Sequence, residues 1–113
     1  MAQYYQKNKY RNVRCRCNEN HMHDSRGEAG YCNNLQLQVK SGDIMKFESQ
    51  KKFDLHFNNK KISSHIVDFL VHHFDGKIEV HEYKGKATDV WKLKRAHFEA
   101  EYPDIPYIVI WHK

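Results

Sequence analysis

Three acidic side chains, Glu28, Asp68 and Glu82, occupy positions that the surrounding hydrophobic pattern assigns to the protein interior. Asp68 interrupts an apolar strand, and Glu82 continues the apolar face of the next strand, with Lys84 two residues further on. An ionised carboxylate is costly to bury unless a positive partner compensates for the lost hydration. Three inward-pointing acids therefore predict a metal site, and their hard oxygen ligands favour Mg²⁺ or Mn²⁺.

These residue types are suited to phosphoryl chemistry. A divalent ion neutralises the charge that develops on a phosphate and activates a water molecule. Lys84, held beside Glu82, would orient or deprotonate that water, or stabilise the pentacoordinate phosphate. The residues therefore predict a nuclease, in which water attacks a phosphodiester in line with the leaving oxygen.

Each of these residues also has an ordinary structural explanation. Glu28 is at the N3 position of a capping box, where a glutamate needs no metal ion. Asp68 could form a salt bridge with a neighbouring lysine, and Glu82 with Lys84 could be an exposed ion pair. Gln50 would either help to position the site or lie on the surface of its strand. The shared face of Glu82 and Lys84, together with the inward acids, favours one common site.

Hydrophobic periodicity and turn residues predict the elements that hold these side chains. Gly42 stops the first helix, and Thr88 or Asp89 caps the second. Asn58-Asn59 and Asp75-Gly76 are typical of the turns between strands. The predicted elements are helix 26–40, strands 47–57, 64–72 and 78–84, helix 89–102 and strand 107–112.

The same pattern assigns faces to the core. Strand 64–72 is apolar on both faces, with Ile66 and Leu70 on the face of Asp68, and is predicted to be central. Strand 107–112 is also apolar on both faces and is predicted to be another inner strand. The remaining core predictions are one side of strand 47–57, formed by Phe53, Leu55 and Phe57, and one side of the second helix, formed by Val90, Trp91, Phe98 and Tyr102.

Asp68 on one strand and Glu82-Tyr83-Lys84 on the next, with a glutamate on a preceding helix, resemble the PD-(D/E)xK nuclease superfamily. The chain is most similar to a group of small phage-encoded domains in that superfamily, over roughly residues 9–110. The motifs that carry the resemblance are Asp24-Ser25 with Glu28-Ala29, Gly42-Asp43-Ile44 through Phe47-Glu48 with Gln50 and Phe53, Ile66-Val67-Asp68-Phe69, Glu79-Val80 with Glu82-Tyr83-Lys84-Gly85, and Trp91-Lys92-Leu93-Lys94 leading to Tyr102-Pro103-Asp104.

The resemblance implies an α/β fold with a restriction-endonuclease-like core, in which a mixed central sheet in αβββαβ order is flanked by helices. It implies metal roles for Asp68, Glu82 and Glu28, and a catalytic role for Lys84. The implied activity is that of a divalent-metal-dependent DNA endonuclease encoded by a phage or mobile element. Val67 stands where the superfamily's name places a proline, so the first motif is a single aspartate.

Length and composition predict a single domain over residues 1–113. Residues 1–12 are predicted to form a basic and aromatic arm, and residues 13–23 a small β-hairpin. The longest apolar run, 107–111, is too short to span a membrane, and the polar start of the chain does not resemble a signal peptide. We therefore expect an intracellular protein, and the resemblance to phage-encoded domains implies the cytoplasm of a bacterial host cell.

The predicted hairpin carries a second cluster of possible metal ligands. Cys15, Cys17, His21 and His23 would share one of its faces, and thiolates with imidazoles are zinc ligands. The spacing is unusual for a structural zinc site, which commonly places two to four residues between the first pair of cysteines. Cysteines that pack as small apolar residues are the alternative.

A net charge of +5 fits a polyanionic partner such as DNA. The small surface favours branched or single-stranded DNA, or recruitment by a host or phage protein, over a long base-specific site, and a homodimer would supply two cuts. The alternative function is a non-catalytic module on the same fold that binds nucleic acid or protein, with zinc in the hairpin. The residues predicted to contact phosphates, unless they form a merely solvated face, are Lys86, Lys92, Lys94, Arg95, Lys60 and Lys61.

Overall fold

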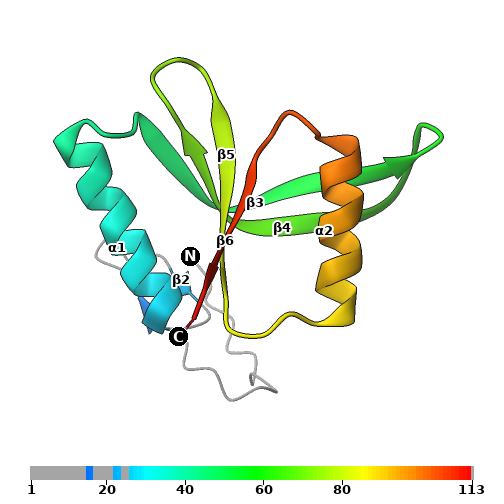
Figure 1. Cartoon of the computed structure of the whole chain (residues 1–113), viewed down its shortest axis with the longest axis horizontal. Coiled ribbons are helices and arrows are strands. Elements are labelled where there is room, and N and C mark those ends of the chain that lie inside the picture. The colour runs from blue at the N-terminus through cyan, green and yellow to red at the C-terminus, as the bar shows by residue number, and fades with distance from the viewer. Residues whose placement is uncertain (1–14, 17–21, 24–25, 113) are drawn as a thin grey trace.

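The computed structural model of the chain describes residues 15–16, 22–23 and 26–112. Two helices flank a sheet of four strands (Figure 1). Neither helix is long and apolar enough to cross a membrane. The elements are β1 (Cys15–Arg16), β2 (Met22–His23), α1 (Arg26–Ser41), β3 (Lys46–Phe57), β4 (Lys60–His72), β5 (Ile78–Lys84), α2 (Asp89–Glu101) and β6 (Tyr107–Trp111).

The predicted order of helix, three strands, helix and strand is confirmed, and local residue chemistry explains the boundaries. Gly42 follows α1 with φ of 82°, a left-handed conformation that glycine adopts without steric cost. Asn58 and Asn59 both have positive φ and connect β3 to β4 as a two-residue hairpin turn. The Thr88 hydroxyl accepts a hydrogen bond from the Trp91 N–H and caps α2.

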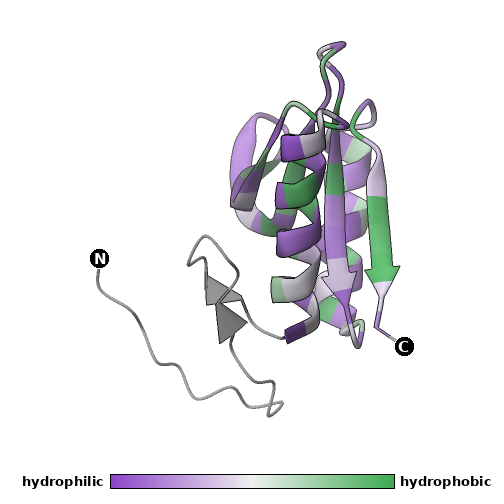
Figure 2. Ribbon diagram, turned by 90° about the vertical axis from the view of Figure 1, so that its left-hand side faces the viewer, coloured by the Kyte–Doolittle hydropathy of each residue, from purple (hydrophilic) through white to green (hydrophobic). Residues whose placement is uncertain are grey.

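The sheet has the order β3-β4-β5-β6, with β5 and β6 parallel and the other pairs antiparallel. The central position of β4 is confirmed, whereas the prediction of an inner position for the last strand is wrong. β6 is an edge strand, and the hydrophobic part of it is green in Figure 2, next to the C-terminus. Helices cover both faces of its neighbours, so apolar side chains on both of its faces do not require a strand on each side.

Two hydrophobic clusters lie on opposite sides of the sheet. Along β3 and β4, side chains that would share one face of a straight strand are divided between the two clusters. Phe69 packs in the cluster of α1, whereas Val67 packs in the cluster of α2, although the two residues have the same parity on β4. On β3 the same change separates Phe47, which packs against the α1 cluster, from Phe53 and Leu55, which belong to the α2 cluster. The β3–β4 hairpin therefore turns about its own axis and wraps around α2.

The change of side occurs at Gln50, which has φ of 56° within β3. This left-handed conformation is unusual for a residue other than glycine and bends the strand locally. The bend also explains one wrong burial prediction, because alternation along a straight strand does not hold across it. Ile66, on the part of β4 that pairs with β3 beyond the bend, is exposed rather than buried. The predictions for Phe57 and Val90 are also wrong: Phe57 follows a register shift between Leu55 and His56, and Val90 is on the outer face of α2.

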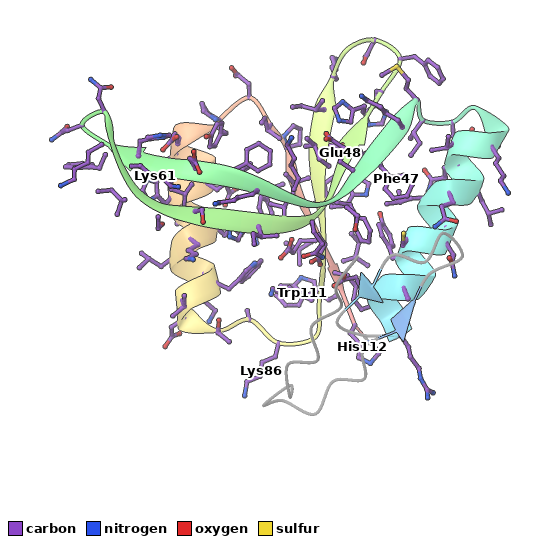
Figure 3. All side chains as sticks on the ribbon, turned by 180° about the vertical axis from the view of Figure 1, so that it is seen from behind. Phe47, Glu48, Lys61, Lys86, Trp111 and His112 are labelled. Atoms are coloured by element: carbon purple, nitrogen blue, oxygen red, sulfur yellow. The ribbon has the colours of Figure 1, made fainter. Side chains whose placement is uncertain are left out.

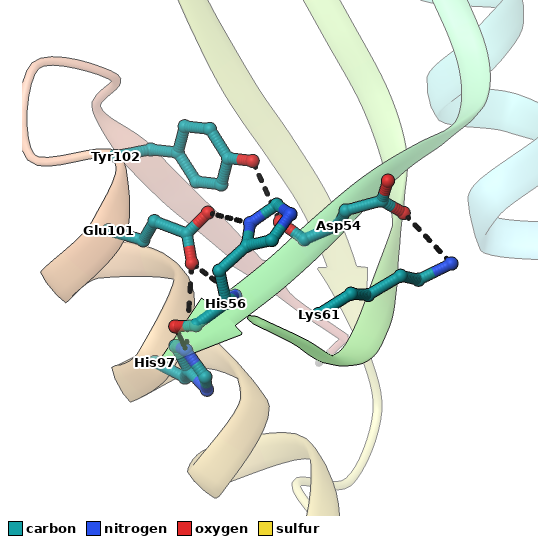
Figure 4. A network of polar contacts seen from close by, with 6 residues as sticks. All are labelled: Asp54, His56, Lys61, His97, Glu101 and Tyr102. Atoms are coloured by element: carbon teal, nitrogen blue, oxygen red, sulfur yellow. Dashed lines mark hydrogen bonds and ion pairs between the residues drawn. The ribbon is translucent and has the colours of Figure 1, made fainter. Parts of the chain in front are cut away.

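Polar contacts fasten the far part of this hairpin to the last turns of α2 (Figure 4). The Glu101 carboxylate accepts hydrogen bonds from the backbone N–H and the imidazole of His56. The Tyr102 hydroxyl donates to the backbone carbonyl of Asp54 at 2.7 Å, and the His97 imidazole contacts the carbonyl of His56 at 2.9 Å. These contacts hold the hairpin arm in its bent position.

Candidate functional site

The predicted acids meet where β4 and β5 separate. The backbone ladder between these strands ends at the pair Phe69 and His81, one position before Asp68 and Glu82. Beyond that pair, side chains replace the backbone acceptors. The Asp68 N–H donates to Glu82 Oε2 at 2.9 Å, and the Tyr83 N–H donates to Asp68 Oδ2 at 2.9 Å. The two carboxylates therefore fill the fork between the strands.

The fork is an unfavourable environment for negative charge. Glu82 is 2% exposed, and burial raises the pKa of its carboxyl group. Burial, reinforced by the nearby carboxylates of Glu82 and Glu28, raises the pKa of Asp68 far above its usual range. A cation beside these groups would remove this penalty, because it would stabilise both carboxylates in their ionised form.

Lys84 and Trp91 complete one side of the fork. Lys84 Nζ lies 3.8 Å from Glu82 Oε1, and the Trp91 indole N–H donates to the same oxygen at 3.2 Å. Lys84 Nζ also lies 5.0 Å from the centroid of the Trp91 ring. The sequence identified Trp91 as a core residue and as part of a motif of the resemblance, but gave it no role in the site, because its contact with Glu82 depends on how α2 packs across the sheet.

Gln50 and Glu28 occupy the opposite side. The register between β3 and β4 places Gln50 opposite Asp68, at the bend of β3. Gln50 Nε2 donates to Glu28 Oε2 at 3.2 Å, and Glu28 is 3% exposed. The structure thus brings Gln50, a minor candidate in the sequence, into the site as a positioning residue for Glu28.

Glu28 can approach the fork because its neighbour Gly27 has no side chain. A Cβ at Gly27 would lie 2.2 Å from the Tyr83 hydroxyl oxygen and 2.4 Å from the adjacent ring carbon. The tyrosine ring therefore occupies the space beside the first turn of α1, between that helix and β5. This close approach lets the first turn of α1, which carries Glu28, pack directly against Tyr83 of β5.

We expect Gly27→Ala to destabilise the protein by about 1–3 kcal/mol, because the Tyr83 ring or the helix must move. Gly30→Ala is the matched control on the same helix, since a Cβ at Gly30 would meet nothing within 4 Å. That control should gain up to about 1 kcal/mol from the higher helix propensity of alanine. Chemical denaturation followed by circular dichroism would measure both effects, and equal stabilisation by both variants would contradict the proposed close packing.

The arrangement suits a divalent ion held by two protein carboxylates. Across the described part of the chain, no three His, Cys, Asp or Glu side chains form a ready cage for a metal ion. Mg²⁺ commonly uses only one or two carboxylates and completes its octahedron with water and substrate phosphate oxygens. Asp68 and Glu82 fit that requirement, because they are hard oxygen donors beside each other in a buried fork.

The predicted phosphate contacts do not form one continuous rim. Lys61 lies at the tip of the β3–β4 hairpin and Lys86 at the other end of the sheet (Figure 3). Lys61 forms an ion pair with Asp54 at 3.4 Å. Lys94 Nζ donates to the Ser64 carbonyl at 3.0 Å, and the Arg95 guanidinium lies 5.0 Å from the Tyr107 ring centroid. Lys60 adjoins Lys61 at the start of β4, whereas Lys92 is on the exposed surface of α2.

The zinc prediction falls mainly outside the described residues. Cys15 pairs with His23 in the register of β1 and β2, which agrees with the predicted hairpin at these two positions. Cys17 and His21 lie outside the described residues. The zinc site in the hairpin therefore stays a prediction.

The fold and the site define an α/β protein in which two buried carboxylates and a lysine converge at a fork between strands. The chain belongs to the family described as "protein of unknown function (DUF1064)", which it matches over residues 4–112. No curated protein and no solved structure matches the chain.

Proposed function

We propose that this protein is a divalent-metal-dependent endonuclease that hydrolyses DNA phosphodiester bonds. The observation that carries the proposal is the buried pair of Asp68 and Glu82, with Lys84 Nζ 3.8 Å from the glutamate. Two adjacent acids that disfavour ionisation, next to a lysine, are typical of a metal-assisted phosphoryl-transfer site. The resemblance to the PD-(D/E)xK superfamily, including its element order, adds support.

Each residue would have a distinct part in hydrolysis. A bound Mg²⁺ or Mn²⁺ would supply charge neutralisation at the phosphate and activation of a water molecule. Asp68 and Glu82 would hold the ion, and the reciprocal backbone hydrogen bonds would fix the orientation of both carboxylates. Glu28, held by Gln50, would bind a water molecule at the edge of the site.

Lys84 would act through its positive charge. Its two neighbours, a carboxylate oxygen and the face of the Trp91 ring, are both attractive to an ammonium group. From this position the ammonium would orient the attacking water or stabilise the negative charge that develops on the phosphate. A role as a cation therefore has more support from the contacts than a role as a base.

The test is a cleavage assay with purified full-length protein on single-stranded, branched and duplex DNA. We expect cleavage products with Mg²⁺ or Mn²⁺ and none with excess chelator. Thermal unfolding in the same buffers gives an independent readout, because an ion that binds only the folded state raises the melting temperature. DNA binding without metal-dependent cleavage on any of these substrates would instead support the non-catalytic binding module.

A further inference from the structure

The two tryptophans of the chain differ sharply in exposure. Trp91 is 8% exposed, and its indole N–H is bonded to Glu82. Trp111, at the end of the edge strand β6, is 51% exposed. Tryptophan is enriched at binding surfaces, because it combines a large apolar ring with a polar N–H group.

Trp111 lies next to the proposed catalytic lysine. In the parallel register of β5 and β6, Trp111 is the partner of Lys84, so both side chains are on the same face. Their shared neighbour is Trp91: its ring centroid is 6.2 Å from that of Trp111 and 5.0 Å from Lys84 Nζ. The exposed indole is therefore at the rim of the carboxylate and lysine site.

This end of the sheet also carries aromatic and basic groups on its other side. His112 follows Trp111, and its imidazole contacts the Tyr83 hydroxyl at 2.8 Å. The His112 N–H donates to the Lys84 carbonyl at 2.7 Å, which fixes the end of β6 against β5. Lys86 is exposed in the segment after β5, and Figure 3 shows Trp111, His112 and Lys86 toward this end of the molecule.

We propose that Trp111 stacks on an unpaired base next to the phosphate that is cut, so that the substrate is DNA with a single-stranded segment at the cleavage point. Stacking on an aromatic side chain contributes about 1–3 kcal/mol per base and tolerates any base, because every base has a flat face. In an intact duplex those faces are already covered by neighbouring base pairs. Lys86 would contact the phosphate backbone beside the stacked base.

This inference rests on the proposed function, since it uses the position of Lys84 as the cleavage point. It also selects single-stranded or splayed DNA from the broader set of substrates. A patch for another protein would also expose an indole, but it would not account for the neighbouring lysine and carboxylate site.

The test compares Trp111→Ala with the wild-type protein in binding a thymidine oligonucleotide and a blunt duplex of equal length. Ca²⁺ replaces Mg²⁺ so that binding is measured apart from cleavage. We expect the dissociation constant for the oligonucleotide to rise roughly 5-fold to 100-fold, and that for the duplex to change less than about twofold. Trp111→Phe should keep part of the affinity, and Leu93→Ala, at another exposed apolar residue, should keep all of it.

Tryptophan fluorescence provides a readout that a structural role would not produce. The oligonucleotide should quench the emission of the wild type but not that of Trp111→Phe, in which only the buried Trp91 emits. Equal dissociation constants for Trp111→Ala and wild type on the oligonucleotide would overturn the stacking contact, as would equal losses on both DNAs. Metal-dependent cleavage by the wild type in that case would show that the nuclease proposal stands by itself, whereas absence of both binding and cleavage would overturn both proposals.

Discussion

Asp68→Asn is expected to eliminate cleavage while making the protein more stable. Loss of a carboxylate that is proposed to bind the metal should lower the cleavage rate by roughly 10³-fold or more, because a negative charge that would hold the ion is removed. The asparagine can still accept the Tyr83 N–H hydrogen bond that Asp68 Oδ2 accepts. The fork between the strands therefore keeps its shape without its buried acid.

The stability gain has a defined dependence on pH. The pKa of Asp68 is raised in the folded protein by burial and by the neighbouring carboxylates. Folding is therefore favoured by this group below its ordinary unfolded pKa near 4, and that contribution is lost as the pH rises toward the raised folded value. Asparagine has no such loss, so the variant should be more stable than the wild type by about 2 kcal/mol or more at pH 8.

Chemical denaturation at a series of pH values would measure this difference, which should shrink toward zero near pH 4. Asp54→Asn is the matched control, because Asp54 is exposed on β3 and its ion pair with Lys61 contributes little. Addition of Mn²⁺ should raise the melting temperature of the wild type and of this control, but not that of Asp68→Asn. Equal stability of the two variants at pH 8 would contradict the account of the buried acids.

The sequence predicted the elements well because their signals are local. The left-handed Gly42, the Asn58-Asn59 hairpin turn and the Thr88 cap each depend on residues within a few positions. The sequence also indicated that Asp68 and Glu82 are unusual, because each acid lies on a strand face that is otherwise apolar and predicted to be buried. Because both acids were assigned to inward-pointing positions of their strands, the sequence predicted that they share one site.

The features that sequence analysis missed depend on contacts distant in the chain. Nothing in the residue type of Gln50 predicts a φ of 56°, which depends on the pairing of β3 with β4. The edge position of β6, which leaves Trp111 half exposed, depends on the order of strands in the sheet. The exposure of Phe57 follows the register shift between Leu55 and His56, because periodicity assumes a regular strand.

The bend and the site are physically connected. Gln50 lies opposite Asp68, so β3 bends at the position where β4 leaves β5. The separation of the strands frees backbone N–H groups, and the carboxylates of Asp68 and Glu82 satisfy two of them. The proposed site at this point needs no loop, since two strands of the sheet hold its carboxylates.

The second large effect is expected for Lys84→Met, which removes the ammonium group but keeps most of the apolar stem. Cleavage should fall by about 10²-fold to 10⁴-fold, because the developing phosphate charge or the attacking water loses its positive partner. Binding of the metal ion should persist, since Asp68 and Glu82 are intact. Loss of activity with a preserved Mn²⁺-induced shift in melting temperature would therefore separate this variant from Asp68→Asn.

Lys84→Arg distinguishes the two possible actions of the lysine. Arginine keeps the positive charge beside Glu82 and over the Trp91 ring, but it does not give up a proton in proteins. Since the contacts of Lys84 are those of a cation, we expect Lys84→Arg to cleave DNA faster than Lys84→Met. Lys77→Met serves as the control, because the Lys77 side chain is 83% exposed and the residue precedes β5, at the end of that strand opposite to Lys84. Cleavage by Lys84→Met at the rate of that control would remove Lys84 from the mechanism, and activity only in the wild type would favour a base over a fixed charge.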